Sequence, residues 1–590
     1  MNYFLFSHPF QNATRFVLLL AILLLNFGYG GTSVAYAAPP AHNDFASAKT
    51  INDIEYHDTV NTTEATPNDQ FPNSVVGDPD NFLCEDDTGS SSNTRAGFAS
   101  IWYKYTPPEA QSLSLDATGK EINSDIVLDL YIAVWTGTQG NLTLVACNDE
   151  TFSGFPELSF VANAGTTYYI EVAQYNDGNT ATSNFGGEVK FNAYITNTNV
   201  RVGNVLRGRY FIPESGGLRR SFINLNNGPV EINNVAGNQI IAAERVIYTV
   251  REVPTSFSEL MGLPHNQLGT TYWLPWYNNV HLETQLRIGN VSSSTANVTI
   301  TIANQPVTGG SFSLAPGAST RVSFVGVNNG PVKIVSTQNI VAAERVIYKV
   351  RGIETSFSEM MALPTSQLNT TYWLPWYNNV HLDTQLRIGN VSEAQATVTI
   401  TIGGVPMGNP IQLAPGASTR VSFEGVNNGP VKIVSTQNIV AAERVIYKVR
   451  GIETSFSEMM ALPANQLDNI YWMPWYNNVH LDTQLRIGNV SGTPATVRVF
   501  IGGTEMSDSP FVLPVGGSTR KSYTDINNGP VRIESNVDIV AAERVIYKVQ
   551  GIETSFSEMM GLPNSFLSAR YWMPWYNNVN LDTQLRFALP

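Results

Sequence analysis

The stretch YWLPWYNNVHLDTQLRIGNV, residues 372–391, occurs in four closely similar copies. The copies begin at Tyr272, Tyr372, Tyr471 and Tyr571, so their spacings are 100, 99 and 100 residues. The units of a solenoid are much shorter, with periods of roughly 20–50 residues. The longer period therefore predicts an array of small folded domains along the second part of the chain.

The two ends of the array set the phase of the repeat. The chain ends at Pro590, and residues 581–590 align with residues 481–490. At the start of the array, residues 216–222 align with residues 516–522. In this phase the aromatic stretch closes each unit, and the array holds four whole units, namely residues 196–291, 292–391, 392–490 and 491–590.

Within one unit, apolar and polar residues alternate with the period of a β-strand. In the third unit Val398, Ile400 and Ile402 alternate with threonines, which predicts a strand with one buried face. A turn is expected at Pro415-Gly416 and a hairpin turn at residues 427–430 (NNGP), because Gly and Asn tolerate positive φ. About seven strands per hundred residues favour an immunoglobulin-like β-sandwich for each unit.

A short helical turn is expected inside each unit. Ser455 and Glu458 form a Ser-x-x-Glu capping box, which is followed by Met-Met-Ala-Leu and stopped by a proline. The same pattern starts at Ser256, Ser356 and Ser555. We expect this turn to close one end of each sandwich with Phe, Met and Leu side chains.

Residues 1–37 have the layout of a secretory signal peptide. Arg15 precedes an apolar run at residues 16–25, and Ala35-Tyr36-Ala37 forms a small-residue cleavage site. The apolar run is shorter than the roughly 20 residues that a membrane-spanning helix needs. We therefore expect cleavage after Ala37, no transmembrane segment in the mature chain, and a secreted or cell-surface location.

Residues 41–195 contain short apolar stretches separated by turn residues, without a helical period, which predicts a β-sandwich. Strands are expected at residues 100–105, 126–135 and 166–172. Residues 38–195 hold 22 acidic and 5 basic residues, a net charge of −17, while the whole chain has −14. Neither this acidic segment nor the nearly neutral array offers a basic face for phosphates, so no nucleic-acid partner is expected.

The order of motifs in the acidic segment resembles the bacterial pre-peptidase C-terminal (PPC) domain. The matching pieces are Asn43-Asp44-Phe45, IWYKYTPP (101–108), LDLYIAVWTG (128–137), LVACNDE (144–150) and AGTTYYIEV (164–172). The resemblance implies a jelly-roll-like sandwich of the kind found beside secreted peptidases and other surface modules, without a catalytic domain. The array resembles uncharacterised tandem repeats of bacterial surface proteins, with an ERVIY strand, an SFSEMM turn and a YWxPWY strand.

Cys84 and Cys147 are the only cysteines, and in an exported protein they are expected to form one disulfide. The bond would bring two acidic loops together. Hard oxygen ligands at this density suit Ca²⁺, so calcium is the candidate cofactor. The alternative is that these carboxylates are solvated and turn outward. The residues concerned are Asp86, Asp87, Asp149 and Glu150.

The repeated WxPWYNN sequence, in which x is Leu or Met and which we abbreviate as WPWYNN, is the candidate ligand-binding element. Aromatic faces stack on sugar rings and Asn amides bond hydroxyls, so the stretch would suit a cell-surface glycan. The alternative, which we favour, is packing within or between domains, because alternation buries at least one face of the strand. The candidate residues are Trp273, Trp276, Tyr277, Trp373, Trp376, Tyr377, Trp472, Trp475, Tyr476, Trp572, Trp575 and Tyr576.

A Glu-Arg pair recurs inside an apolar strand of the units. Adjacent strand residues point to opposite faces, so the two side chains cannot pair with each other. We expect each to pair with a partner on a neighbouring strand or unit, in a structural role. The pairs are Glu344-Arg345, Glu443-Arg444 and Glu543-Arg544.

Histidine holds one position of the repeat, at His281, His381 and His480, but Asn580 takes that position in the last unit. A repeated ligand or base would not be optional, so we expect exposed turn residues. The sequence has no His-Glu-x-x-His, Gly-x-Ser-x-Gly, Cys-x-x-Cys or phosphate-loop motif. No catalytic residue is predicted, and the chain is expected not to be an enzyme.

These features favour a secreted, non-enzymatic structural or adhesive protein. In this hypothesis the repeats form a stalk that presents the acidic sandwich to an extracellular partner. A second hypothesis is a carbohydrate-binding protein that uses the four WPWYNN faces. A third is an accessory subunit of a secreted hydrolase, which rests on the resemblance of the acidic segment alone.

Overall fold

The computed structural model describes residues 39–65, 98–123, 126–139, 141–148, 155–174, 186–250, 253–350, 353–449, 452–549 and 552–590. Their secondary structure is almost entirely β, as predicted, and their helical elements are three-residue 3₁₀ turns. In this part of the chain, no helix has the length and apolar character of a membrane span. The predicted signal peptide, residues 1–37, lies outside the described residues and stays a prediction.

The strands of the N-terminal region pair into two sheets. One has the order β1-β3-β8-β5-β6 and the other the order β2-β9-β4-β7. The interleaving of early and late strands in β2–β9 is that of an eight-stranded jelly roll. The strands are β1 (Lys49–Thr50), β2 (Tyr56–Asn61), β3 (Phe98–Tyr105), β4 (Gln111–Lys120), β5 (Leu130–Thr138), β6 (Asn141–Asn148), β7 (Glu157–Ala162), β8 (Tyr168–Gln174) and β9 (Glu188–Ile195).

This strand order confirms the jelly-roll-like sandwich predicted for residues 41–195. β3, β5 and β8 overlap the three stretches in which strands were expected. Ile101, Trp102 and Tyr103 of β3 are fully buried, so this strand supplies much of the core. The resemblance to the PPC family stays a prediction.

Residues 193–590 belong to a second compact unit, which we describe by itself. It contains four similar groups of strands, which we call blades. Blade 2 is continuous in sequence and comprises β18 (Gly269–Leu274), β19 (Tyr277–Asn278), β20 (Glu283–Asn290), β21 (Ala296–Ile302), β22 (Gln305–Leu314), β23 (Ser319–Val322), β24 (Asn328–Asn329), β25 (Val332–Val350), β26 (Ile353–Met361) and β27 (Leu363–Pro364).

The long strand β25 organises the blade, because both sheets share it. Its first half pairs with β18 and β21, and its second half pairs with β20 and β26. The predicted β-sandwich is confirmed. The two sheets are joined through one strand, however, whereas an immunoglobulin-like sandwich has two separate sheets.

Blades 3 and 4 repeat this arrangement. Blade 3 comprises β28 (Asn369–Leu374), β29 (Tyr377–Asn378), β30 (Asp383–Asn390), β31 (Ala396–Ile402), β32 (Val405–Pro406), β33 (Ile411–Leu413), β34 (Ser418–Val421), β35 (Asn427–Asn428), β36 (Val431–Val449), β37 (Ile452–Met460) and β38 (Leu462–Pro463). Blade 4 comprises β39 (Asp468–Met473), β40 (Tyr476–Asn477), β41 (Asp482–Asn489), β42 (Ala495–Ile501), β43 (Thr504–Glu505), β44 (Phe511–Leu513), β45 (Ser518–Lys521), β46 (Asn527–Asn528), β47 (Val531–Val549), β48 (Ile552–Met560) and β49 (Leu562–Pro563).

Blade 1 joins the two ends of the array. Strand β52 lies between β12 and β15, and β50 lies between β14 and β17. The blade comprises β10 (Thr198–Val202), β11 (Val205–Tyr210), β12 (Gly217–Arg220), β13 (Asn226–Asn227), β14 (Val230–Asn234), β15 (Ile241–Val250), β16 (Val253–Met261), β17 (Leu263–Pro264), β50 (Arg570–Met573), β51 (Tyr576–Asn577) and β52 (Asp582–Ala588).

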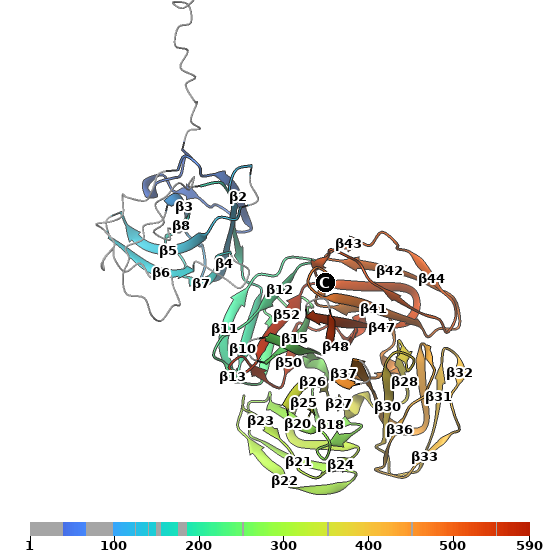
Figure 1. Cartoon of the computed structure of the whole chain (residues 1–590). Helices are drawn as coiled ribbons and strands as arrows, with labels where there is room; N and C mark the ends of the chain where they lie inside the picture. The colour runs from blue at the N-terminus through green and yellow to red at the C-terminus, as the bar shows by residue number, and fades with distance from the viewer. Residues whose placement is uncertain are drawn as a thin grey trace, which may run out of the picture. The chain divides into compact units, whose positions relative to one another are not determined.

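These pairings correct the predicted units 196–291, 292–391, 392–490 and 491–590. The aromatic stretch opens a blade instead of closing one, since β18 of the first predicted unit pairs with β25 of the second. The last predicted unit gives β50–β52 to blade 1, so the four blades close into a ring (Figure 1). The predicted linear stalk is therefore wrong. The alignment of the first and last repeats puts a unit boundary at each end of the array. In the structure the two ends of the array lie within one blade, so the predicted unit boundaries do not coincide with blade boundaries.

The inner strands β16, β26, β37 and β48 meet at the centre of the ring, where four buried serine hydroxyls form a closed square. Neighbouring Oγ atoms are 3.1–3.2 Å apart around Ser256, Ser356, Ser455 and Ser555. Each hydroxyl can donate one hydrogen bond and accept another, so the square satisfies itself. Each inner strand also donates a backbone N–H to a serine of the preceding blade, at 2.8 Å.

The helical turns predicted from Ser256, Ser356, Ser455 and Ser555 are wrong, because these serines lie on the inner strands. The capping box is a local signal. In the ring, β37 pairs with β36 and its serines bond to both neighbouring blades. These long-range bonds outweigh the local preference, as serine readily bonds in non-helical backbone.

The two predicted turns of the third unit have different outcomes. Pro415-Gly416 forms a turn, as predicted, with a positive φ of 70° at Gly416. The hairpin turn predicted at residues 427–430 is wrong. Asn427 and Asn428 form β35, which pairs with β29 of the aromatic stretch. A partner 50 residues away in sequence replaces the local turn.

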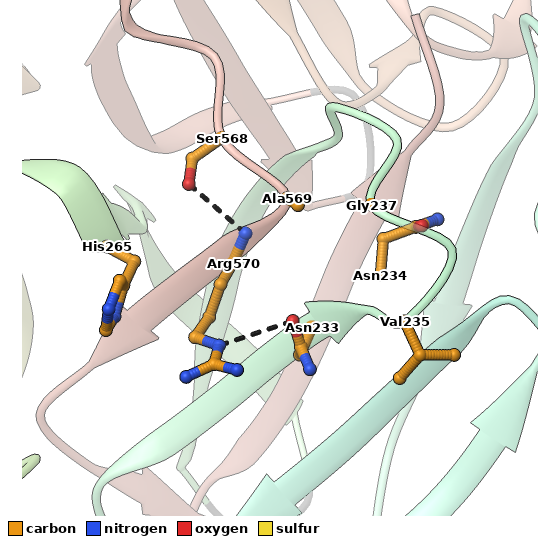
Figure 2. Close-up of a pocket in the computed structure, with 8 residues that line it drawn as sticks. All are labelled: Asn233, Asn234, Val235, Gly237, His265, Ser568, Ala569 and Arg570. Atoms are coloured by element: carbon orange, nitrogen blue, oxygen red, sulfur yellow. Dashed lines mark hydrogen bonds between the residues drawn. The ribbon is translucent and has the colours of Figure 1, made fainter.

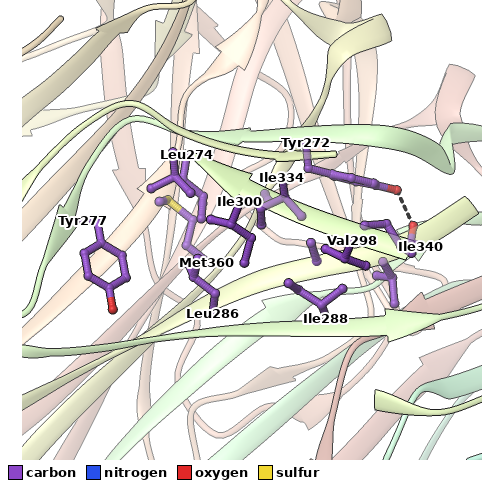
Figure 3. Close-up of a cluster of buried hydrophobic side chains, with 14 of the residues drawn as sticks. Tyr272, Leu274, Tyr277, Leu286, Ile288, Val298, Ile300, Ile334, Ile340 and Met360 are labelled. Carbon is purple, nitrogen blue, oxygen red and sulfur yellow. Dashed lines mark hydrogen bonds between the residues drawn. The ribbon is translucent and has the colours of Figure 1, made fainter. Parts of the chain in front are cut away.

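Each blade has an apolar core, and the cores are not independent. In blade 2, Ile288, Ile300 and Ile334 pack together, and Tyr272 donates its hydroxyl to the carbonyl of Ile340 at 2.6 Å (Figure 3). The same core contains Trp572 of blade 1. A blade therefore completes part of the core of its neighbour.

We predict that deleting residues 570–590 destabilises the whole ring. The deletion removes three strands from blade 1 and takes Trp572 out of the core of blade 2. Scanning calorimetry should show a lower unfolding temperature for all four blades together. Asn580→Ala, an exposed change in the same segment, should leave the transition unchanged. If three blades keep the original transition after the deletion, the blades are independent.

Candidate functional site

A cluster of buried charges lies beside each inner strand. In blade 2, Arg345 donates to Glu359 Oε1 from both Nε and Nη2, each at 2.7 Å. Arg287 Nη1 lies 3.3 Å from the same oxygen. All three side chains are buried, and this confirms the predicted structural role of Arg345. The equivalent pairs are Arg245–Glu259, Arg444–Glu458 and Arg544–Glu558.

Glu344 links its blade to the next one. Its electrostatic neighbours are Glu458, Arg444 and Arg387, which all belong to blade 3. Burial, followed by repulsion from Glu458, raises the pKa of Glu344 well above its usual range. Burial also lowers the pKa of Arg387 to about 9. The arrangement recurs at the other three junctions, so these ionisable groups form a closed cycle around the ring.

The first tryptophan of each WPWYNN stretch packs against the next blade. Trp273 belongs to the core of blade 3, Trp373 packs on the core of blade 4, and Trp472 belongs to the core of blade 1. The Nε1–H group of Trp273 donates to Thr365 Oγ1 at 2.9 Å, in the segment that connects blades 2 and 3. These rings hold blades together, which agrees with the packing alternative.

The second tryptophan of each stretch is half-buried at a junction between blades. Trp276 donates its Nε1–H to Asn328 Oδ1 at 2.9 Å, and the Arg387 guanidinium of blade 3 lies 6.0 Å from its ring centre. The tryptophan–asparagine bond recurs in all four blades. The second tryptophans Trp276, Trp376, Trp475 and Trp575 all keep an exposed fraction, and of the first tryptophans Trp373 does so as well.

The tyrosine of each stretch is buried and belongs to the blade framework. The Tyr277 hydroxyl donates to the Thr284 carbonyl at 3.0 Å and accepts the Phe324 N–H at 2.6 Å. Equivalent bonds to a threonine carbonyl hold Tyr377, Tyr476 and Tyr576. The histidines that follow, His281, His381 and His480, are exposed, as predicted.

An open hollow of about 510 Å³ lies on blade 1, where the two ends of the array meet (Figure 2). Eight positions separate Ile232 from Ile240 in this blade, whereas six separate the equivalent Ile334 and Ile340 of blade 2. The additional residues interrupt the long strand beside the hollow. Its lining consists of Asn233, Asn234, Val235, Gly237, His265, Ser568, Ala569 and Arg570.

Arg570 is the charged residue of this lining. Its Nε donates to Asn233 Oδ1 at 3.3 Å and lies 3.2 Å from Glu231 Oε1. Its backbone N–H donates to Ser568 Oγ at 3.2 Å (Figure 2). Arg201 Nη1 lies 3.5 Å from the same Glu231 carboxylate. Two arginines thus share one carboxylate, which leaves a positive charge at the hollow.

His265 lines the hollow as a neutral imidazole. Burial first, and the positive charge of Arg570 second, lower the pKa of His265. Trp572 Nε1–H donates to His265 Nδ1 at 3.0 Å, so the proton of the neutral ring is on Nε2. The hollow therefore combines a guanidinium, an imidazole N–H, amides and a hydroxyl, a set rich in hydrogen-bond donors.

The residues of the hollow were not among the candidates predicted from the sequence, because that prediction used residues that recur in every repeat. A comparison of the positions at which the repeats differ would have identified them. At the positions of His265, Ser568 and Arg570, blade 2 has Thr365, Gly269 and Thr271. Blade 2 thus lacks both the guanidinium and the imidazole that line the hollow on blade 1.

The predicted calcium ligands Asp86, Asp87, Asp149 and Glu150 lie outside the described residues, and so does Cys84. Among the residues that the structure describes, no cysteine is free and no group of three or more His, Cys, Asp or Glu is arranged to hold a metal. The disulfide with Cys147 and the calcium site both stay predictions.

No family model and no curated protein matches this sequence. Among solved structures, the chain is weakly similar to the M60 catalytic domain with two CBM51 domains of Clostridium perfringens ZmpB, at 8% identity over 58% of this chain and 32% of that chain, with a TM-score of 0.11. A glycoside hydrolase family 32 structure from Bifidobacterium adolescentis matches at 8% identity over 83% and 97%, with a TM-score of 0.15. The mycobacterial arabinofuranosyltransferase AftD matches at 10% identity over 81% and 42%, with a TM-score of 0.12. Scores this low assign no activity.

We predict that Glu344→Gln becomes more stabilising, relative to the unsubstituted chain, as the pH rises. The raised pKa means that the fold favours protonated Glu344, so this stabilisation is present below the ordinary carboxyl pKa and is lost as the pH rises through the raised value. Glutamine resembles the protonated form at every pH. The difference in unfolding free energy should grow by on the order of 1 kcal/mol per pH unit.

Denaturant titrations between about pH 5 and about pH 8 measure this difference. Glu424→Gln is the matched control, because Glu424 is an exposed acid on blade 3. Its difference from the unsubstituted chain should stay constant with pH. A pH-independent difference for Glu344→Gln would show that Glu344 is charged in the folded ring.

Proposed function

We propose that this chain is an exported, non-enzymatic binding protein that acts at the cell surface in a structural or adhesive role. The observation that supports the proposal best is how the ring uses its repeated residues. The Arg–Glu clusters, the serine square and the first tryptophans all connect blades. Repetition thus serves a closed scaffold, and the hollow on blade 1 is where the scaffold departs from its repeat.

The hollow favours binding over catalysis. A hydroxyl nucleophile needs a base within hydrogen-bond reach. Ser568 Oγ accepts the backbone N–H of Arg570, and His265 Nδ1 accepts the Nε1–H of Trp572. Within this described lining, serine and histidine are therefore committed to separate partners. The hollow can hold a ligand through Arg570, His265 and Asn233.

A second candidate function is carbohydrate binding at four repeated sites. It is favoured by the exposed fractions of Trp276, Trp376, Trp475 and Trp575, which recur once per blade. The indole N–H of each of these tryptophans is already bonded to an asparagine, so a sugar would have to stack on the exposed part of the indole. A role beside a secreted hydrolase rests on the PPC resemblance and adds no further site.

We predict that a ligand binds the mature chain with one site, not four. The chain would be screened on immobilised surface glycans and extracellular proteins, and the strongest ligand would then be titrated by calorimetry. One site per chain is expected if the hollow binds, and four sites are expected if the second tryptophans bind. Trp276→Ala should leave binding at the hollow unchanged. If the second tryptophans bind the ligand, the same variant should reduce four sites to three.

Two results would contradict the proposal. The first is release of sugar or peptide products from the bound ligand, which would show catalysis. The second is a screen in which the folded chain retains none of the surface glycans or proteins. Thermal unfolding of the same preparation establishes that the chain used in the screen is folded.

A further inference from the structure

The terminal nitrogens of Arg570 are available to a ligand. Its Nε is engaged by Asn233 Oδ1 and Glu231 Oε1. Neither Nη atom has a hydrogen-bond partner within the described part of the chain. Figure 2 shows that the bond from the guanidinium to Asn233 is made by Nε and not by a terminal nitrogen. A planar pair of N–H donors matches the two oxygens of a carboxylate.

The sheet beside Arg570 carries a row of polar and basic residues. Cross-strand partners point to the same face of a sheet, and Arg570, Asn233, Asn199 and Arg209 are successive partners across β50, β14, β10 and β11. The neighbouring row places Arg201 opposite Glu231 on that face. The four charged residues named here, three arginines and one glutamate, together carry a net charge of +2.

The equivalent row of blade 2 has none of these charges. It runs through Thr271, Val335, Thr299 and Ser311 across β18, β25, β21 and β22. The two rows have the same backbone pairing, so the difference lies in the side chains and not in the fold. This position in blade 1 therefore carries a charge pattern that the ring does not need in order to close.

We propose that the hollow binds the carboxylate of an acidic saccharide, such as a hexuronate unit, and this proposal rests on the binding function proposed above. Arg570 pairs with the carboxylate, and His265 Nε2–H donates to a ring or hydroxyl oxygen. The amide of Asn233 and the hydroxyl of Ser568 lie at the same lining and suit sugar hydroxyls. Its volume of about 510 Å³ is within the range of sites for small ligands.

Titration of the full mature chain with a galacturonate oligomer, and with the neutral galactose oligomer of equal length, tests the proposal. The neutral oligomer should bind about tenfold more weakly or worse, because hydrogen bonds to a charged group contribute at least that much. Arg570→Thr should weaken galacturonate binding by a similar factor. Threonine is the residue of blades 2 and 3 at this position, as Thr271 and Thr371 show, so the variant is expected to fold.

Arg321→Thr is the matched control, because it removes an exposed arginine from the edge strand of blade 2 and should leave affinity unchanged. His265→Thr, which copies Thr365, is the second variant and should also weaken binding. Equal affinity for the two oligomers, unchanged binding by Arg570→Thr, or an equal loss with Arg321→Thr would overturn the carboxylate assignment. If one neutral glycan still binds at one site, the proposed function stands. If no surface ligand binds, both fail.

Discussion

Ring closure is the constraint on which the rest of the second unit depends. Blade 1 has no complete sheet until β50–β52 of the C-terminal end pair with β10–β17 of the N-terminal end. Once they do, every blade has two neighbours. The serine square, the Arg–Glu clusters and the tryptophans that enter the next core then repeat around the circle without a free end. In each blade a buried arginine of the long strand pairs with a glutamate of the inner strand, which offsets part of the cost of burying the two charges.

The sequence predicted the local chemistry of the strands well. Alternation at Val398, Ile400 and Ile402 identified a strand, and the opposite faces of Glu344 and Arg345 required partners on other strands. The phase of the blades could not be predicted in the same way. A circle of repeats has no natural first residue, so the alignment of residues 581–590 with residues 481–490 does not show where a blade begins. The helical turn predicted for the SFSEMM segment was wrong for a related reason. The segment forms a strand because of its contacts with blades about 100 residues away in sequence.

The candidate site follows the opposite logic. The aromatic residues that recur most visibly are mostly used for packing, and Tyr277 and Trp273 are buried. The hollow instead comes from residues that break the pattern, namely Arg570, His265 and the lengthened segment between Ile232 and Ile240. Repetition in a ring reports what the scaffold requires. Residues that differ between blades are not required for the ring to form, so these positions are free to build a ligand site.

The distance between the two ends of the array tests the account most directly. Spin labels would be introduced at the exposed positions Val235 and Val579, which both belong to blade 1 although they lie 344 residues apart in sequence. A blade-sized domain is roughly 30 Å across. Double electron–electron resonance should therefore give a single distance below about 40 Å between the labels, once the length of the labels is included. Four sandwiches in a line would separate the labels by about 100 Å or more. A distance of that length would contradict ring closure.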